Sequence, residues 1–170
     1  MVPVYEYNGE VLRSLEGSPS GYGSGYAELA TINKGANGYR LPTLAEWQYA
    51  AKGGENYIYS GSDDPNEVSW FGNNEGTGGN SLGKKQEVMT LKPNGYGIYD
   101  MSGNVWEWVQ NEEVSSDGKN KHYRVMCGGS IWGFPSDGEI TNFQTREPSK
   151  AGSSFGFRLV RNIPSASSSE

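Results

Sequence analysis

Two carboxylates flank a glycine-containing turn in the middle of the chain: Asp100 and, seven residues later, Glu107. Carboxylates interleaved with the backbone carbonyls of such a turn are the ligands that a hard cation such as Ca²⁺ takes. The same stretch, residues 94–108, also fits a half-buried strand in which Trp106 and Trp108 are core anchors and the aspartate caps a turn. By spacing alone this second, structural interpretation is favoured.

Other chemistry has little support in the sequence. The one cysteine, Cys127, excludes an internal disulfide and a thiolate metal cluster, and the one histidine, His122, excludes a site made of several histidines on this chain. Ser130 is not part of a recognisable nucleophile-elbow sequence. Two further acidic residues, Asp63 and Asp64, lack the spacing of an EF-hand loop and are expected to lie in a solvated turn.

The composition predicts a single, loop-rich domain. Of 170 residues, 34% are hydrophobic, 12% are aromatic and 25 are glycines, which is enough for a core but unlike a helical bundle. A net charge of −6 without a basic stripe argues against a nucleic-acid partner. We find no apolar run of membrane-spanning length and no signal-peptide pattern, so the chain is not expected to insert into a membrane. Its location is not predicted; display on a cell or virus surface would require another partner.

Local signals place the elements. Residues 43–52 are expected to form a helix, because Thr43 and Glu46 fit a capping box and Gly53 follows the last apolar position. Strands are expected at residues 2–7, 57–59, 123–127 and 155–160, and a disordered tail at residues 165–170. The stretch between the last two strands, residues 131–154, has almost no periodicity, which is typical of a segment that carries binding function.

Three blocks in order carry a family resemblance: GYRLPTLAEWQYAAKGG, NGYGIYDMSGNVWEW, and RVMCGGS with GFRLVR. The chain thereby resembles the formylglycine-generating enzyme (sulfatase-modifying factor) family and, within it, the lectin-fold variable proteins of diversity-generating retroelements. The resemblance implies an α+β, C-type-lectin-like fold with a small twisted antiparallel sheet, few helices and much irregular loop. It also implies a lectin-like domain at residues 37–164, preceded by an N-terminal segment, residues 1–36, that is shorter than in the family.

The resemblance also bears on catalysis. Formylglycine-generating enzymes hold copper with two cysteines, and the matching positions here are Gly133 and Gly138. Glycine offers no thiolate, so we expect neither copper nor catalysis. If the calcium site of the family is retained as a structural site, its ligands would be the carboxylates of Asp100 and Glu107 and the carbonyls of Gly103 and Val105.

The functional hypothesis is therefore a non-catalytic module, like a retroelement-diversified receptor, that binds a protein or cell-surface ligand through residues 131–147. The alternative is an oxidase of the formylglycine-generating type, or a degenerate relative of one. The oligomeric state is not predicted. The candidate ligand-binding residues, chosen as aromatic or adaptable polar side chains in or beside this segment, are Cys127, Ile131, Trp132, Phe134, Asp137, Glu139, Thr141, Phe143, Gln144 and Arg146.

Overall fold

The chain forms two compact units. One joins Met1–Leu41 to Leu159–Glu170, and the other is Pro42–Arg158, which contains every candidate site residue. The computed structural model describes residues 4–7, 10–11, 31–33, 35–72, 79–114, 122–148 and 150–162. Among these residues, no helix is both long enough and apolar enough to cross a membrane. The expected C-terminal tail lies outside the described residues.

The first unit contains two small antiparallel sheets. In one, β1 (Tyr5–Tyr7) lies between β2 (Glu10–Val11) and β3 (Thr31–Ile32). In the other, β4 (Tyr39–Arg40) pairs with β11 (Val160–Arg161). The strand expected at residues 2–7 thus begins at Tyr5 within the described part.

Helix α2 (Leu44–Lys52) confirms the helix expected at residues 43–52. The Thr43 hydroxyl accepts a hydrogen bond from the Glu46 N–H at 3.2 Å, and a Glu46 carboxylate oxygen accepts one from the Thr43 N–H at 2.8 Å. This reciprocal capping satisfies amide groups that the first turn would otherwise leave unpaired. The helix ends at Gly53, whose φ of 60° belongs to the left-handed region that glycine adopts readily.

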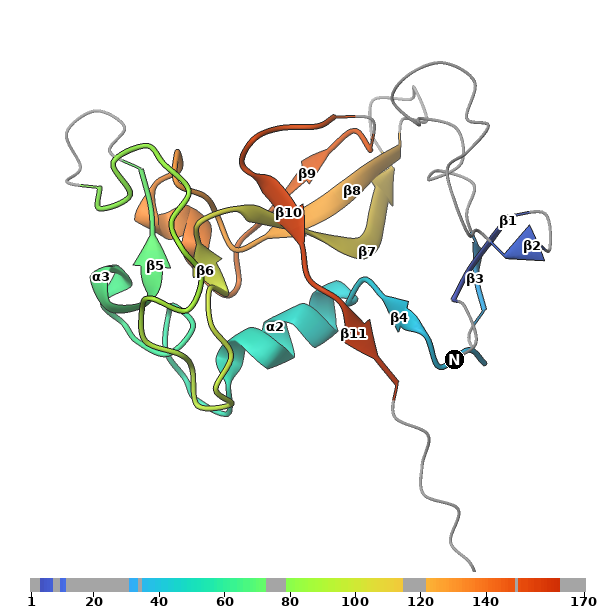
Figure 1. Cartoon of the computed structure of the whole chain (residues 1–170), viewed down its shortest axis with the longest axis horizontal. Helices are drawn as coiled ribbons and strands as arrows, with labels where there is room; N and C mark the ends of the chain where they lie inside the picture. The colour runs from blue at the N-terminus through green and yellow to red at the C-terminus, as the bar shows by residue number, and fades with distance from the viewer. Residues whose placement is uncertain are drawn as a thin grey trace, which may run out of the picture. The chain divides into compact units, whose positions relative to one another are not determined.

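A four-stranded sheet forms the centre of the second unit (Figure 1). Its strands are ordered β10 (Phe155–Phe157), β7 (Trp106–Val114), β8 (His122–Cys127) and β9 (Phe143–Arg146). β7, β8 and β9 are antiparallel neighbours, whereas β10 runs parallel to β7, so the sheet is mixed.

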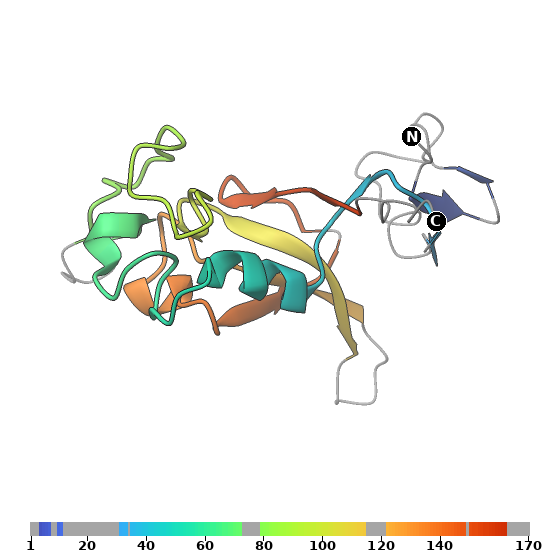
Figure 2. The ribbon, with the colours of Figure 1, turned by 90° about the horizontal axis from the view of Figure 1, so that it is seen from below.

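Helix α2 lies along one face of this sheet (Figures 1 and 2) and closes the core. Trp47 and Ala51 of the helix pack with Val109, Val125 and Cys127 of the sheet. On the strand β7, Trp106 is 5% exposed and Trp108 is half-buried against the edge of the Phe155 ring, with centroids 5.8 Å apart. Both tryptophans therefore pack in or beside the core, as the alternating pattern predicted.

Shorter elements flank the sheet. A parallel pair, β5 (Ser69–Trp70) and β6 (Ser102–Gly103), follows the one-turn helix α3 (Pro65–Val68). Asp64 is the N-cap of α3, because its carboxylate accepts the Asn66 N–H at 2.9 Å; this acidic pair is thus a turn and cap rather than a cation loop. A 3₁₀ turn, η2 (Pro135–Gly138), lies after β8.

Two sequence expectations are corrected here. Residues 57–59 do not form a strand: Tyr59 makes only an isolated bridge with Ser62. The segment 131–154 is less irregular than its lack of periodicity indicated, since it contains η2 and the whole of β9. The sequence does not predict β9, because this edge strand carries polar residues and shows no alternation of buried and exposed positions.

A candidate ligand-binding surface on residues 131–147

The loop at residues 131–134 is held against two segments distant in sequence. The Gly72 N–H donates to the Gly133 carbonyl at 3.0 Å, and the Ser81 hydroxyl donates to the Ile131 carbonyl at 2.9 Å. Within the loop itself, a carboxylate oxygen of Asp137 accepts the Phe134 N–H at 3.0 Å. The backbone that carries Trp132 and Phe134 is therefore fixed on both sides, which suits the presentation of large side chains to a ligand.

Three aromatic side chains of the segment face solvent: Trp132 is 50% exposed, Phe134 is 44% exposed and Phe143 is 39% exposed. Thr141 and Arg146 are exposed as well, whereas Asp137, Glu139 and Gln144 are half-buried. Two candidates must be withdrawn from the surface, because Cys127 and Ile131 are core residues that are at most 3% exposed. Their burial follows from position: Cys127 ends a strand packed on α2, and Ile131 follows the buried turn at residues 128–130.

Strand β9 divides the remaining candidates between two faces of the sheet. Phe143 lies opposite Cys127 in the register, so it projects on the side of α2. Gln144 lies opposite Met126, and its side-chain oxygen accepts a hydrogen bond from the Arg146 guanidinium at 3.1 Å on the other side. A ligand that contacts Phe143 and one that contacts Gln144 would therefore approach different sides of this edge strand.

A neighbouring loop that the sequence did not indicate adjoins Trp132. The Trp132 ring lies so close to Gly83 that a β-carbon there would stand 3.0 Å from the ring. Beside it, Leu82 is 86% exposed and has a φ of 54°, in the left-handed region that a leucine seldom adopts. The sequence shows only a Ser-Leu-Gly run at the end of a Gly-rich stretch, which does not indicate contact with a residue about fifty positions away.

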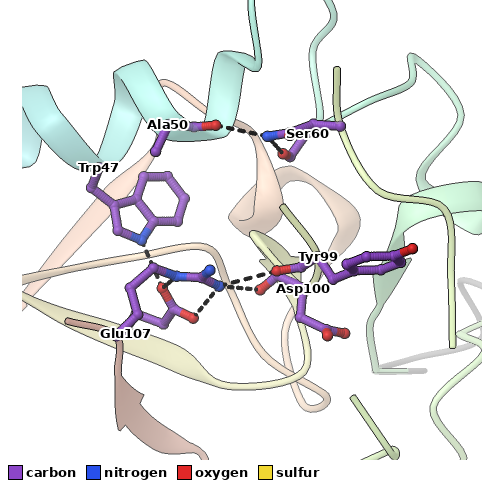
Figure 3. A network of polar contacts seen from close by, with 8 residues as sticks. Trp47, Ala50, Ser60, Tyr99, Asp100 and Glu107 are labelled. Carbon is purple, nitrogen blue, oxygen red and sulfur yellow. Dashed lines mark hydrogen bonds and ion pairs between the residues drawn. The ribbon is translucent and has the colours of Figure 1, made fainter. Parts of the chain in front are cut away.

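The carboxylates proposed as calcium ligands are bonded to other groups of the protein. Glu107 is 6% exposed, and its carboxylate receives two hydrogen bonds from Arg158, at 2.6 and 2.7 Å, and one from the Trp47 indole N–H at 2.7 Å (Figure 3). The same guanidinium donates to the carbonyls of Tyr99 and Asp100 at 3.3 and 3.0 Å. A guanidinium thus occupies the side of the turn to which Glu107 would have brought a cation.

The second predicted carboxylate has a backbone partner of its own. A carboxylate oxygen of Asp100 accepts the Met89 N–H at 2.8 Å. Gly103, whose carbonyl was also predicted as a ligand, lies in β6, and Val105 is half-buried in the chain between β6 and β7. In the part of the chain that the structure describes, no three Asp, Glu, His or Cys side chains are grouped so that they could hold a metal ion. As placed, the carboxylates of Glu107 and Asp100 are each bonded to donors of the protein, an arrangement that does not fit a calcium ion shared between them.

Gly133 and Gly138, the positions that match the copper-binding cysteines of formylglycine-generating enzymes, lie just before η2 and at its last residue. A β-carbon on Gly133 would meet the end of the Asp137 side chain, which would have to move aside. A β-carbon on Gly138 would meet ordinary contacts of 3.4–3.5 Å, among them the Ser69 hydroxyl, the one buried side-chain polar atom among the described residues that has no partner. Burial, and to a lesser degree the nearby Glu107 charge, raises the pKa of the Cys127 thiol to about 12, so this thiol is neutral at physiological pH.

The comparisons with known proteins agree with this architecture. The family model for the sulfatase-modifying factor enzyme 1-like domain matches residues 21–163. The chain is 40% identical over 146 residues to the chaperone protein LppX of Paenibacillus barcinonensis, a match that covers 78% of this chain and 52% of that protein. It is 32% identical over 141 residues to the inactive C-alpha-formylglycine-generating enzyme 2 of Bos taurus, which covers 72% of this chain and 44% of that protein.

Among solved structures, Treponema denticola variable protein 1 superimposes with a TM-score of 0.71 at 29% identity, covering 92% of this chain and 61% of the other. The chain therefore spans about half the length of these curated relatives and less than two thirds of this structure. The matched region includes the mixed sheet, α2 and the whole candidate surface. On the family match and the fold together, the chain belongs to the sulfatase-modifying factor enzyme 1-like family, with the C-type-lectin-like α+β fold that its sequence predicted.

Proposed function

We propose that this chain is a non-catalytic ligand-binding module, which contacts a protein or cell-surface ligand through exposed side chains of residues 131–147. The observation that carries the proposal is the exposure of Trp132 and Phe134 on a loop whose backbone is bonded to Gly72, Ser81 and Asp137. Large aromatic side chains on a fixed backbone lose little conformational freedom when they bind, so they make effective contact residues.

The residue types at positions 133 and 138 support the non-catalytic part of the proposal. Both are glycines, which offer no thiolate, and the chain's single thiol is buried in the core. The similarity to an enzyme relative named inactive and to a variable protein points in the same direction. As a retroelement-diversified receptor, the module would vary its ligand by changing side chains in this segment while the frame around it stays the same.

Binding selection tests the surface. A displayed library of proteins and cell-surface glycans is first screened with the wild-type chain, and affinity for the selected ligand is then measured for Trp132→Ala and Phe134→Ala. We expect each variant to lose at least tenfold in affinity at an unchanged melting temperature. Ile58→Ala is the matched control, because Ile58 is 52% exposed but lies outside the segment; it should bind like the wild type.

A second measurement addresses the alternative, an oxidase. Copper loading followed by incubation with a cysteine-containing peptide should give no formylglycine product, and Cys127→Ser should change nothing. Product formation that Cys127→Ser abolishes would overturn the non-catalytic assignment. Sequencing of the DNA beside the gene tests diversification separately. We expect a reverse-transcriptase gene and an adenine-substituted near-copy of the segment that encodes residues 125–158.

A further inference from the structure

Two exposed tyrosines of the second unit touch through their hydroxyl groups. Tyr49, on α2, is 68% exposed, and Tyr96, in the turn after Asn94, is 49% exposed. The Tyr96 hydroxyl donates a hydrogen bond to the Tyr49 hydroxyl at 3.1 Å, and the ring centroids are 5.7 Å apart with the planes tilted by 44°. The edges that carry the hydroxyls are therefore next to each other, while both rings stay open to solvent.

This pair is held in place by the frame beneath it. The Asn94 side-chain N–H₂ donates to the Ala50 carbonyl at 2.7 Å and to the Ala51 carbonyl at 3.2 Å, which fastens the turn to the end of α2. The Asn94 side-chain oxygen in turn accepts the Tyr96 N–H at 3.0 Å. On the far side, Gly54 has no side chain where a β-carbon would stand 3.2 Å from the Tyr96 ring. Tyr49 and Tyr96 thus meet because their backbones are bonded together, and not by a chance contact of two surface side chains.

We propose that Tyr49 and Tyr96 are a site of intramolecular oxidative cross-linking, at which a one-electron oxidant such as a haem peroxidase with hydrogen peroxide joins the two rings as dityrosine. Each phenol gives one electron to the oxidant and releases one proton. The two phenoxyl radicals then couple through ring carbons adjacent to their hydroxyl-bearing carbons. One carbon–carbon bond forms, the two carbon–hydrogen bonds at those carbons break, and their hydrogens restore the two hydroxyl groups. The two electrons and two protons reduce one hydrogen peroxide to two waters.

The chemistry of the pair fits this reaction. The hydrogen bond with Tyr49 raises the pKa of the Tyr96 phenol, and the two hydroxyl groups are adjacent, as they are in the product. Coupling between carbons beside these hydroxyls needs only a local rotation of two exposed rings. The chain also has no second cysteine with which Cys127 could form an internal disulfide. The tyrosine pair would provide the internal covalent link that its cysteine content does not.

Oxidation of the whole chain tests the proposal, at a protein concentration low enough to disfavour intermolecular coupling. Peroxidase and hydrogen peroxide should give monomeric protein with dityrosine fluorescence and a cross-linked peptide pair that contains residues 49 and 96. Tyr49→Phe and Tyr96→Phe should each lose that peptide pair and most of the fluorescence. Tyr57→Phe is the control, because Tyr57 is 41% exposed but outside the pair, and it should retain both signals.

A thermal readout complements the chemical one. A link between residues 49 and 96 closes a loop in the unfolded chain and reduces its entropy, so oxidised wild type should melt at a higher temperature than untreated protein. The two phenylalanine variants should show no such increase. Dityrosine that appears only in dimers, or a cross-linked yield that Tyr49→Phe leaves unchanged, would overturn the proposal. Neither result would affect the proposed ligand-binding surface, which involves other residues.

Discussion

Arg158 binds both carboxylate oxygens of Glu107, with Nε at 2.6 Å from one oxygen and Nη2 at 2.7 Å from the other. Glu107 is the second residue of β7 and is buried, and the Trp47 indole provides a third hydrogen bond to its carboxylate. Arg158 follows β10 and reaches back to the carbonyls at residues 99 and 100. One ion pair therefore ties together the helix, the central strand and the turn before it.

Substitution of either Glu107 or Arg158 should lower the free energy of unfolding. Glu107→Gln retains the shape of the side chain but leaves the guanidinium without its counter-charge in a largely buried place, and loss of one member of a buried pair costs about 3–5 kcal/mol. Urea unfolding of Glu107→Gln and Arg158→Met should each show a loss in this range. Glu112→Gln is the control, since Glu112 pairs with His122 and Arg124 at the exposed end of the hairpin and should change stability little. Wild-type stability in either core variant would contradict the assigned role.

Two glycines with similar positive φ angles, Gly97 and Gly103, allow the cost of backbone strain to be separated from the cost of side-chain crowding. Gly97 has a φ of 75° and open space where a β-carbon would stand, so Gly97→Ala should lose about 1–2 kcal/mol from the left-handed conformation alone. Gly103 has a φ of 78°, but its β-carbon would collide with the Ser69 hydroxyl and the Trp70 backbone. Gly103→Ala should therefore be much less stable than Gly97→Ala in thermal unfolding. Equal losses would mean that β5 and β6 are not packed as closely as described.

Stability should depend on the ionisation of Cys127 at high pH. Burial raises the pKa of this thiol from 9.0 to about 12 in the folded state. Below pH 9 the thiol is protonated in both states and contributes no pH dependence. As pH rises from about 9 towards 12, the unfolded state loses the proton first, so the free energy of unfolding falls. Comparison of urea unfolding across this range with Cys127→Ala isolates the effect, because the variant should lack that part of the decline.

Calcium should have little effect on the wild-type chain. Because the Glu107 carboxylate is bonded to Arg158 and Trp47, we expect the melting temperature to stay constant during a calcium titration. Asp100→Asn provides the counterpart measurement, since it keeps an oxygen near the Met89 N–H and removes a charge. A calcium-dependent rise in the melting temperature that Asp100→Asn removes would show that the turn rearranges to bind the ion.

The elements that could be predicted from the sequence are those defined by patterns of residues close together in the chain. The capping box of Thr43 and Glu46 identified α2, and the alternation around Trp106 and Trp108 identified a half-buried strand. The ordered sequence blocks gave the fold class. The pairing of β10 with β7 and the contact of Gly83 with Trp132 could not be predicted, because each joins segments about fifty residues apart that carry no matching pattern. For the same reason the sequence could not pair Glu107 with Arg158, which lies in another block.

The position of Arg158 at the end of the second unit also governs when this unit can fold during synthesis. β7 emerges from the ribosome with Glu107 already on the side that α2 covers, yet the counter-charge and the parallel strand β10 are translated about fifty residues later. Until then the nascent chain has an acidic group at the centre of its core and an unpaired edge on β7. The helix and the β7–β8 hairpin can form early from local contacts, but the native core must wait for the last residues of the unit. A stop codon before position 158 would thus leave most of the core residues in place and still prevent the chain from completing its fold.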